Sequence, residues 1–325
     1  MAVTGGTGFI GSHLVRRLLQ QGHTVRVLAR SPEKATKLLG PQVTVVAGDL
    51  TQPNSFPAFL QGVTTVFHLA SLLQDAGTPN KVFWQVHVEA TRQLLEASQR
   101  AGVKQFIHFS TIGVLGAPQQ LPANEESPYQ ASDIYQITKC EGEKLALQAF
   151  QQNKIKGCVI RPTAVYGPGD QRLLKLFKTI AQRKFRMIGN GNIFIHPVHV
   201  EDVVSGSVLA AQKKESHAQI YILGGDHAVP LKTFVALIAN ALGVSLKSSH
   251  IPYWPVWFAA AFCEILCKPL RIQPPLYRRR VDFFAKSRSF DISKAKRELG
   301  YAPRYSLEQG LGETCQWYCN QGWIK

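Results

Sequence analysis

The sequence has 325 residues, of which 45% are hydrophobic and 18% are charged. This length and composition indicate a globular protein with a large core, and they exclude a disordered or fibrous chain. The 37 Lys and Arg against 21 Asp and Glu give a formal net charge of +16. Such a surplus favours an anionic partner: nucleic acid, a membrane surface or a phosphorylated cofactor. No nucleic-acid-binding motif accompanies the charge, so we expect no nucleic-acid partner.

The predicted elements alternate short apolar runs with amphipathic stretches over the first two-thirds of the chain. This alternation predicts an α/β fold, a doubly wound parallel (Rossmann) sheet with crossover helices. The predicted strands are 2–4, 24–28, 43–47, 65–68, 105–109, 158–161 and 219–223. The predicted helices are 11–20, 88–100, 134–151 and 199–211.

Two insertions interrupt the alternation, and we expect them to form a smaller C-terminal lobe that binds substrate. Residues 1–166 and 196–224 then make the Rossmann domain, and residues 167–195 and 225–325 make the lobe. In open α/β sheets the crevice beyond the carboxyl ends of the strands is the usual ligand site. The substrate is expected there.

The first strand runs into a glycine turn that suits a dinucleotide pyrophosphate. Gly5 permits a sharp turn, Gly8 lets the pyrophosphate approach the backbone, and Gly11 lets helix and strand pack closely. The following helix N-terminus supplies free N–H groups and a partial positive charge. We assign the turn to cofactor binding through Gly5, Thr7, Gly8, Phe9, Ile10 and Gly11.

The end of the second predicted strand decides which dinucleotide is used. NAD binding commonly places a carboxylate about 20 residues after the glycines, on the ribose 2′-hydroxyl. Here the strand ends on Arg30, and no carboxylate appears before Glu33. Arg30 can pair with a 2′-phosphate, so the sequence predicts NADP(H), with NAD(H) as the second candidate. The alternative is that Arg30 is only a solvated surface residue.

Tyr135 and Lys139 lie four residues apart and therefore on one face of a helix. An ammonium beside a phenol favours the phenolate and lowers its pKa from about 10, which makes it a better acid–base catalyst. Ser110 and Thr111 close a predicted strand, where a hydroxyl can stabilise charge on a carbonyl or alkoxide oxygen. The four residues form the predicted catalytic set.

These landmarks together resemble an extended short-chain dehydrogenase/reductase of the NAD-dependent epimerase/dehydratase family. The resemblance runs from Met1 to about Gln316, and the order and spacing of the landmarks are specific. They are Gly5/Gly8/Gly11, Gly48-Asp49-Leu50, His68-Leu69-Ala70, Ser110-Thr111, Tyr135/Lys139, 161–170, 199–203, Asp291 and Leu299-Gly300-Tyr301.

The resemblance implies further cofactor contacts. In such enzymes an Asp-Leu pair flanks the adenine, a His-Leu-Ala strand end lines the ribose and nicotinamide, and a Pro-Thr loop borders the nicotinamide amide. The lysine also holds the nicotinamide ribose. The matching residues here are Asp49, Leu50, Leu69, Ala70, Lys139, Pro162 and Thr163.

The same resemblance places the family's catalytic hydroxyl on Thr111, with Ser110 as second choice. The sequence departs from the family at His87, where members often carry an asparagine that opens a helix. His87 either substitutes for it structurally or changes the proton-relay or water network. We do not assign it a catalytic role.

The substrate must be inferred from the lobe, because this fold hosts many chemistries. Nucleotide-sugar members usually carry an asparagine where this chain has Ala164. This difference disfavours a nucleotide-sugar substrate without excluding it. The layout resembles the 3β-hydroxysteroid and sterol dehydrogenase branch, which commonly uses NAD. Dihydroflavonol-reductase-like members share the strand that ends on arginine. The two resemblances disagree on the cofactor.

The segment 251–288 combines an apolar aromatic stretch with a basic cluster. Residues 251–263 are apolar but too short to span a membrane, which takes about 20 residues. Residues 268–288 hold seven Lys or Arg against one acid, Asp282. This combination indicates peripheral membrane contact or the entry to a lipophilic pocket. The alternative is a core helix of the lobe followed by a solvated basic face.

The six cysteines have neither the close pairing nor the accompanying histidines of a metal site, so we expect no metal and a reducing compartment. The chain leads directly into a strand rather than a signal peptide. We therefore expect a cytoplasmic protein, with membrane association through 251–288 as a variant of that expectation.

The sequence thus predicts an NAD(P)-dependent oxidoreductase that interconverts a secondary alcohol and a ketone on a bulky lipophilic molecule, such as a steroid, sterol or flavonoid. The first alternative is a nucleotide-sugar epimerase or dehydratase. The second is a non-catalytic NADP-binding regulatory or assembly protein. By family analogy, a homodimer would form through the helix that carries Tyr135.

Overall fold

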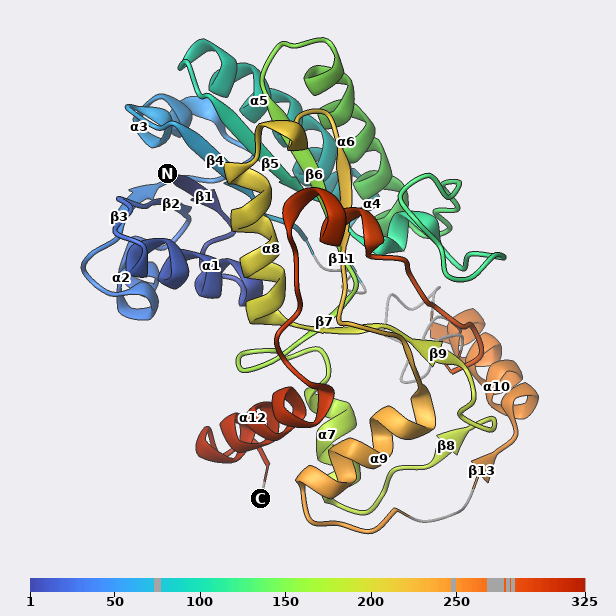
Figure 1. Ribbon diagram of the computed structural model, residues 1–325. Coiled ribbons are helices and arrows are strands. Elements are labelled where there is room, and N and C mark those ends of the chain that lie inside the picture. The colour runs from blue at the N-terminus through green and yellow to red at the C-terminus, as the bar shows by residue number, and fades with distance from the viewer. Residues whose placement is uncertain (73–76, 247–249, 268–277, 279–280, 282–283, 325) are drawn as a thin grey trace.

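A computed structural model of the protein describes residues 1–72, 77–246, 250–267, 278, 281 and 284–324. Its centre is a seven-stranded sheet in the order β11-β6-β5-β4-β1-β2-β3, and every neighbouring pair is parallel (Figure 1). The strands are β1 Ala2–Thr4, β2 Arg26–Ala29, β3 Thr44–Ala47, β4 Thr65–His68, β5 Gln105–Phe109, β6 Gly157–Pro162 and β11 Ile220–Leu223. The predicted doubly wound parallel sheet is confirmed, and its order reverses between β1 and β4.

Helices cover both faces of this sheet (Figure 1). One core cluster joins the sheet to α1 (Phe9–Gln20), α2 (Pro32–Leu39) and α8 (Val200–Gln212). A second joins its other face to α3 (Phe56–Leu60), α5 (Ala90–Arg100) and α6 (Ile134–Gln151). Because both faces are covered, the central strands are buried throughout, as parallel sheets require.

The predicted element boundaries agree with the structure at β1, β4, β5 and α6 and differ elsewhere. The predicted strand 24–28 begins and ends later, at Arg26–Ala29. The predicted helix 88–100 is the end of a longer helical run: α4 (Asn80–Trp84), a π-helical turn η2 (Gln85–Glu89) and α5. Single π-turns within helices often mark functional positions.

A third core cluster lies beyond the carboxyl ends of the strands, in the lower part of Figure 1. It joins α7 (Leu174–Ala181), α9 (Leu231–Ala241) and α12 (Leu307–Asn320). Three two-stranded sheets connect this region: β7 Ala164–Tyr166 with β10 Pro197–His199, β8 Met187–Ile188 with β13 His250–Ile251, and β9 Phe194–Ile195 with β12 Val229–Pro230. Residues 290–301, including the π-turn η5 (Ala295–Leu299), return to the first core cluster. The boundaries between the two domains stay a prediction.

Helix α10 (Tyr253–Cys267) projects at the edge of the molecule (Figure 1). No helix in the described ranges has both the length and the apolar character needed to cross a membrane. The basic positions 268, 271, 279 and 280 and the acid at 282 lie outside the described residues.

Candidate active site

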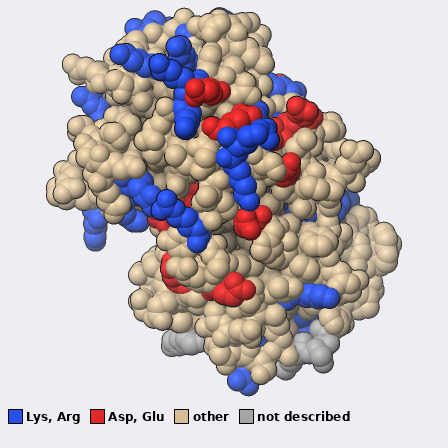
Figure 2. Space-filling view, viewed as in Figure 1, with Lys and Arg blue, Asp and Glu red and all other residues tan. Residues whose placement is uncertain are grey.

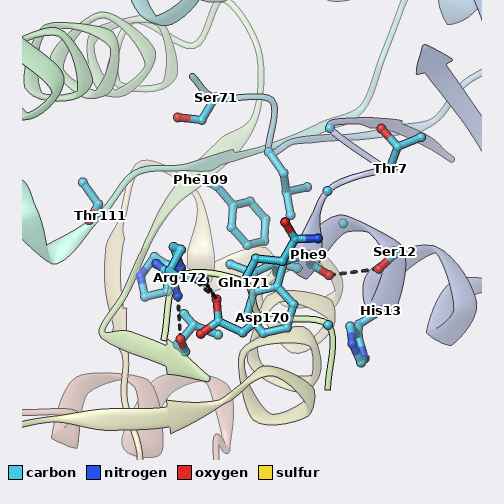
Figure 3. A pocket seen from close by; sticks show the side chains of 18 of the residues that line it. Thr7, Phe9, Ser12, His13, Ser71, Phe109, Thr111, Asp170, Gln171 and Arg172 are labelled. Carbon is cyan, nitrogen blue, oxygen red and sulfur yellow. Dashed lines mark hydrogen bonds and ion pairs between the residues drawn. The ribbon is translucent and has the colours of Figure 1, made fainter. Parts of the chain in front are cut away.

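A cavity of about 690 Å³ opens at the carboxyl ends of β1, β4, β5 and β6, between the sheet and the lobe. The structure brings most of the predicted site residues to it: Gly5, Thr7, Gly8, Phe9, Ile10, Gly11, Leu69, Ser110, Thr111, Tyr135, Lys139, Pro162 and Thr163 line the cavity. Figure 3 shows Phe109 near its middle, with Thr111 on one side and Thr7 on the other.

Four predicted cofactor residues do not line this cavity: Arg30, Asp49, Leu50 and Ala70. The Ala70 backbone still forms the wall behind the glycine turn, since its N–H donates to Thr4 Oγ1 at 3.2 Å. Arg30 is exposed where β2 ends. The Thr51 amide holds the pKa of Asp49 below its usual value, and the Arg30 guanidinium adds to this effect. Arg30 and Asp49 are thus electrostatic neighbours at the carboxyl edge of the sheet.

The glycine turn has the geometry that a dinucleotide needs. Gly5 has a φ of +70°, and a Cβ on Gly11 would lie 2.1 Å from the Gly5 carbonyl oxygen. No side chain caps the helix that begins after Gly8, and its first turn carries no acid. The leading N–H groups of α1 are therefore available to a phosphate.

Lys139 points from α6 toward the end of β5, and its side chain is buried. Its Nζ donates to the Phe109 carbonyl oxygen at 2.5 Å. Burial lowers the pKa of Lys139 to about 8, although the Glu143 carboxylate opposes the shift. At neutral pH most of the ammonium is retained, so Lys139 presents a weakly solvated positive charge beside Tyr135.

Two buried hydroxyls at the cavity, Ser110 Oγ and Thr163 Oγ1, have no hydrogen-bond partner in the part of the chain that the structure describes. Buried polar groups are nearly always paired, so such atoms at a cavity wall indicate a missing ligand. Thr111 Oγ1 accepts from the Gly113 N–H at 3.1 Å, which leaves its proton available. Ser110 is therefore at least as good a candidate as Thr111 for the substrate oxygen.

His87 is buried beside this set and has both ring nitrogens engaged. The Leu72 N–H donates to His87 Nε2 at 3.0 Å, and Ser71 Oγ lies 3.0 Å from the same atom. Nε2 therefore accepts, and Nδ1 carries the proton that it donates to Thr138 Oγ1 at 2.9 Å. Burial lowers the pKa of His87 to about 3. The neutral ring fastens the Ser71–Leu72 loop to the helix that carries Tyr135.

A second buried histidine continues the network under the cofactor turn. Thr4 Oγ1 lies 2.7 Å from His68 Nδ1, and His68 Nε2 lies 3.0 Å from Thr91 Oγ1. Thr91 in turn donates to the His87 carbonyl at 2.8 Å. Burial lowers the pKa of His68 to about 3, so this ring is also neutral. The chain of bonds ties the glycine turn to the π-turn behind α6, the helix that carries Tyr135.

Several lining residues were not predicted from the sequence as site residues. Ser71 follows the His-Leu-Ala strand end, and Asp170 and Arg172 follow the glycines at 167 and 169. Their positions next to these motifs could have identified them as site residues. Arg172 Nε is 3.2 Å from Asp170 Oδ1 (Figure 3). Trp317 and Trp323 come from the C-terminal helix region, and no motif marked them.

The sequence profile of the NAD dependent epimerase/dehydratase family matches residues 1–224, more than half of the chain. The chain belongs to the NAD-dependent epimerase/dehydratase family. The expected family is thereby confirmed, together with the class of enzyme, a nicotinamide-dependent oxidoreductase.

Relatives within this epimerase/dehydratase family match the whole chain. It is 30% identical to a 3-beta-hydroxysteroid dehydrogenase of Mycolicibacterium neoaurum over 97% of this chain and 90% of that protein. It is 32% identical to the sterol-4-alpha-carboxylate 3-dehydrogenase, decarboxylating, of Mus musculus over 97% of this chain and 89% of that protein. A solved dTDP-glucose 4,6-dehydratase of Streptomyces venezuelae with NAD bound has a TM-score of 0.79 and 26% identity, covering 99% of this chain and 98% of that one.

The residues present fit the nicotinamide dinucleotide of the family. The uncapped turn at Gly8 offers N–H groups for the pyrophosphate, and Ser110 and Thr163 offer unpartnered hydroxyls. Among the described residues no group of three or more His, Cys, Asp or Glu side chains is placed to hold a metal ion.

Proposed function

We propose that the protein is an NADP(H)-preferring oxidoreductase that interconverts a secondary alcohol and a ketone on a bulky lipophilic molecule. One observation carries the proposal. A single cavity brings together the glycine turn, Tyr135, the buried ammonium of Lys139 and the unpartnered hydroxyl of Ser110. A structural helix face would not require these groups to meet an uncapped helix N-terminus.

Each side chain has its own role in the transfer of a hydride and a proton. When bound, the nicotinamide supplies or accepts the hydride. Tyr135 donates a proton to the substrate oxygen in reduction and accepts it in oxidation. Ser110 or Thr111 donates a hydrogen bond to that oxygen as charge develops. Lys139 supplies positive charge beside the phenol and holds the ribose of the dinucleotide.

His87 is a positioning residue for Tyr135. Its ring lies edge-on to that of Tyr135, with 5.6 Å between the ring centroids. The bonds of His87 to Leu72 and Thr138 fix the loop and the helix on two sides of the cavity. Tyr135 is thereby held in one orientation toward the substrate.

The preference for NADP(H) rests on Arg30. This exposed arginine stands at the end of β2, where a carboxylate would bind the 2′-hydroxyl of NAD. Asp49 lies near enough for the two charges to interact, but Thr51 already holds its carboxylate with two bonds, both at 2.8 Å. The guanidinium is left to pair with a 2′-phosphate.

Two observations support a lipophilic substrate: the apolar lining of the cavity and the names of two relatives. Phe9, Ile10, Leu69, Phe109 and Val165 line the cavity with apolar surface. Two of the relatives are named for a steroid and a sterol. Ala164, which lies where sugar-nucleotide enzymes of the family usually carry an amide, offers no polar side chain.

The test is a turnover screen of the whole protein with NADPH and NADP⁺. It sets a panel of steroids and flavonoids against UDP- and dTDP-sugars. We expect net change in cofactor absorbance with at least one lipophilic alcohol or ketone. Sugar conversion without net cofactor turnover would replace this proposal by a nucleotide-sugar epimerase or dehydratase; a dTDP-glucose 4,6-dehydratase is among the structural neighbours.

A further inference from the structure

Helix α10 (Tyr253–Cys267) carries a stripe of large apolar side chains on the surface. The stripe consists of Trp254, Phe258, Phe262, Ile265 and Leu266, which are 64%, 63%, 63%, 68% and 53% exposed. The spacing of four, four and three residues keeps the first four on one side of the helix, and Leu266 lies four residues beyond Phe262 on the same side. Contiguous exposed apolar surface of this kind marks an interaction site.

The stripe belongs neither to the cavity nor to a core. No residue of α10 lines the cavity, and within the described chain Ala260 alone of this helix is buried. Figure 2 shows the right-hand bulge of the molecule, where Figure 1 places α10, as uncharged over most of its surface. The stripe therefore faces outward, where a binding partner could cover it.

The charges on α10 and in the sequence that follows it favour an anionic occupant. Glu264 is the one acid of α10, and it accepts from Arg278 through Nε at 2.8 Å. The Arg278 guanidinium also lies over the Trp257 ring, 5.7 Å from its centroid. The helix thus presents no uncompensated negative charge. The sequence that follows, 268–288, has seven basic residues against one acid.

We propose that this face docks on the surface of an anionic lipid bilayer, with α10 lying in the plane of the interface. A helix of 15 residues is about 22 Å long, which is less than the bilayer core of about 30 Å. Trp254 is suited to the headgroup level, and the aliphatic and phenyl side chains to the acyl boundary. The seven Lys and Arg of 268–288, which follow α10 in the sequence, attract anionic lipids.

A second copy of the chain fits this face less well. In a two-fold dimer the same patch meets itself. The dimer would then also bring together two copies of the basic sequence that directly follows α10, which repel each other. A bilayer that contains anionic lipid instead suits both the apolar stripe and the basic sequence that follows α10. This inference is independent of the proposed substrate and cofactor.

The experiment measures co-sedimentation of the full chain with phosphatidylcholine vesicles, with and without phosphatidylserine. We expect binding that requires phosphatidylserine and weakens as salt rises. The double variant Phe258→Ser/Phe262→Ser should lower the partition coefficient by at least about tenfold, because it removes two large apolar groups from the interface. Trp84→Ser, which changes a tryptophan that is 42% exposed outside the stripe, should bind as the wild type does.

Circular dichroism and NADPH titration check that each variant is folded. Failure of the wild type to bind vesicles with phosphatidylserine would overturn the inference, and so would equal binding by the double variant. Conversion of a dimer to a monomer by Phe258→Ser/Phe262→Ser, seen by sedimentation velocity without lipid, would assign the face to a second copy instead. None of these outcomes touches the turnover screen, so the two proposals fail separately.

Discussion

Lys139 and Ser110 show how single residues prepare the cavity for a ligand. Lys139 bonds to a backbone carbonyl, and burial lowers its pKa to about 8, so its ammonium is held close to losing its proton. Ser110 has a buried hydroxyl without a partner in the described chain. Each arrangement costs stability when the cavity holds only water, because buried polar groups need partners. A dinucleotide and a substrate oxygen would satisfy both.

Arg30 is expected to contribute to the affinity for NADPH and not to that for NADH. Arg30→Ser should weaken NADPH binding by about tenfold or more, since hydrogen bonds to a charged group contribute roughly 1.5–3 kcal/mol. Binding of NADH should hardly change. Fluorescence titration measures both constants. Arg100→Ser, which removes the same charge at the end of α5, serves as the control, and an equal loss in both variants would assign the effect to net charge alone.

His87 gives the second prediction, on pH. Its pKa is about 3 in the folded protein against an ordinary value of 6.5, so the unfolded chain binds more protons between these values. The stability it contributes is present above about pH 6.5 and is lost as pH falls toward 3. His87→Asn should flatten the fall in unfolding free energy by up to about 1.4 kcal/mol per pH unit. Denaturant titrations from about pH 7 to pH 4 measure the slope. Identical slopes would mean that His87 is charged in the fold.

At the scale of elements, a buried ion pair fixes α6 to β6. Arg161 and Glu143 are almost fully buried, with Arg161 Nη2 2.5 Å from Glu143 Oε1. Tyr129 donates to the same carboxylate at 2.7 Å, and Arg161 also donates to the Glu125 carbonyl at 3.0 Å. Glu143 lies one turn beyond Lys139 on α6. The pair therefore sets where α6, which carries Tyr135 and Lys139, lies on the sheet.

Breaking this pair should be costly because it leaves an uncompensated buried charge. We expect Glu143→Ala to lower the free energy of unfolding by about 3–5 kcal/mol. Glu96→Ala removes one of the two exposed partners of Arg92 and should change this free energy by less than about 1 kcal/mol. Denaturant unfolding measures both. A loss below about 1 kcal/mol in Glu143→Ala would show that the pair does not hold the helix.

Helix α6 and the π-turn η2 show what the sequence could and could not predict at this scale. The bounds of α6 were predicted correctly, because the helix has a local start signal: Asp133 caps it by accepting from the Gln136 N–H at 2.9 Å. The π-turn has no such signal. It lies where α6 approaches so closely that a Cβ on Gly142 would be 2.2 Å from the His87 carbonyl oxygen. Only the packed fold shows this contact.

At the scale of the whole molecule, the sheet was predictable and the cavity wall was predictable in part. Buried β-strands alternating with amphipathic helices determine the parallel sheet, and the carboxyl ends of its strands carry the predicted catalytic residues. The tryptophans at 317 and 323 reach the cavity only because α12 packs with α7 and α9 beyond the carboxyl ends of the strands. Sequence spacing does not encode such a return. The dimer expected through α6 stays a prediction.

The proposed oxidoreductase chemistry depends most directly on the phenol of Tyr135. The decisive measurement compares turnover and NADPH binding in Tyr135→Phe, with Tyr305→Phe as a control that removes the same group from a ring stacked on His199 outside the cavity. The account predicts a loss of kcat of at least about a hundredfold in Tyr135→Phe, the scale of a positioned acid–base group. It also predicts nearly unchanged NADPH affinity, and wild-type turnover in the control. Full turnover in Tyr135→Phe, with a substrate from the screen, would contradict the account.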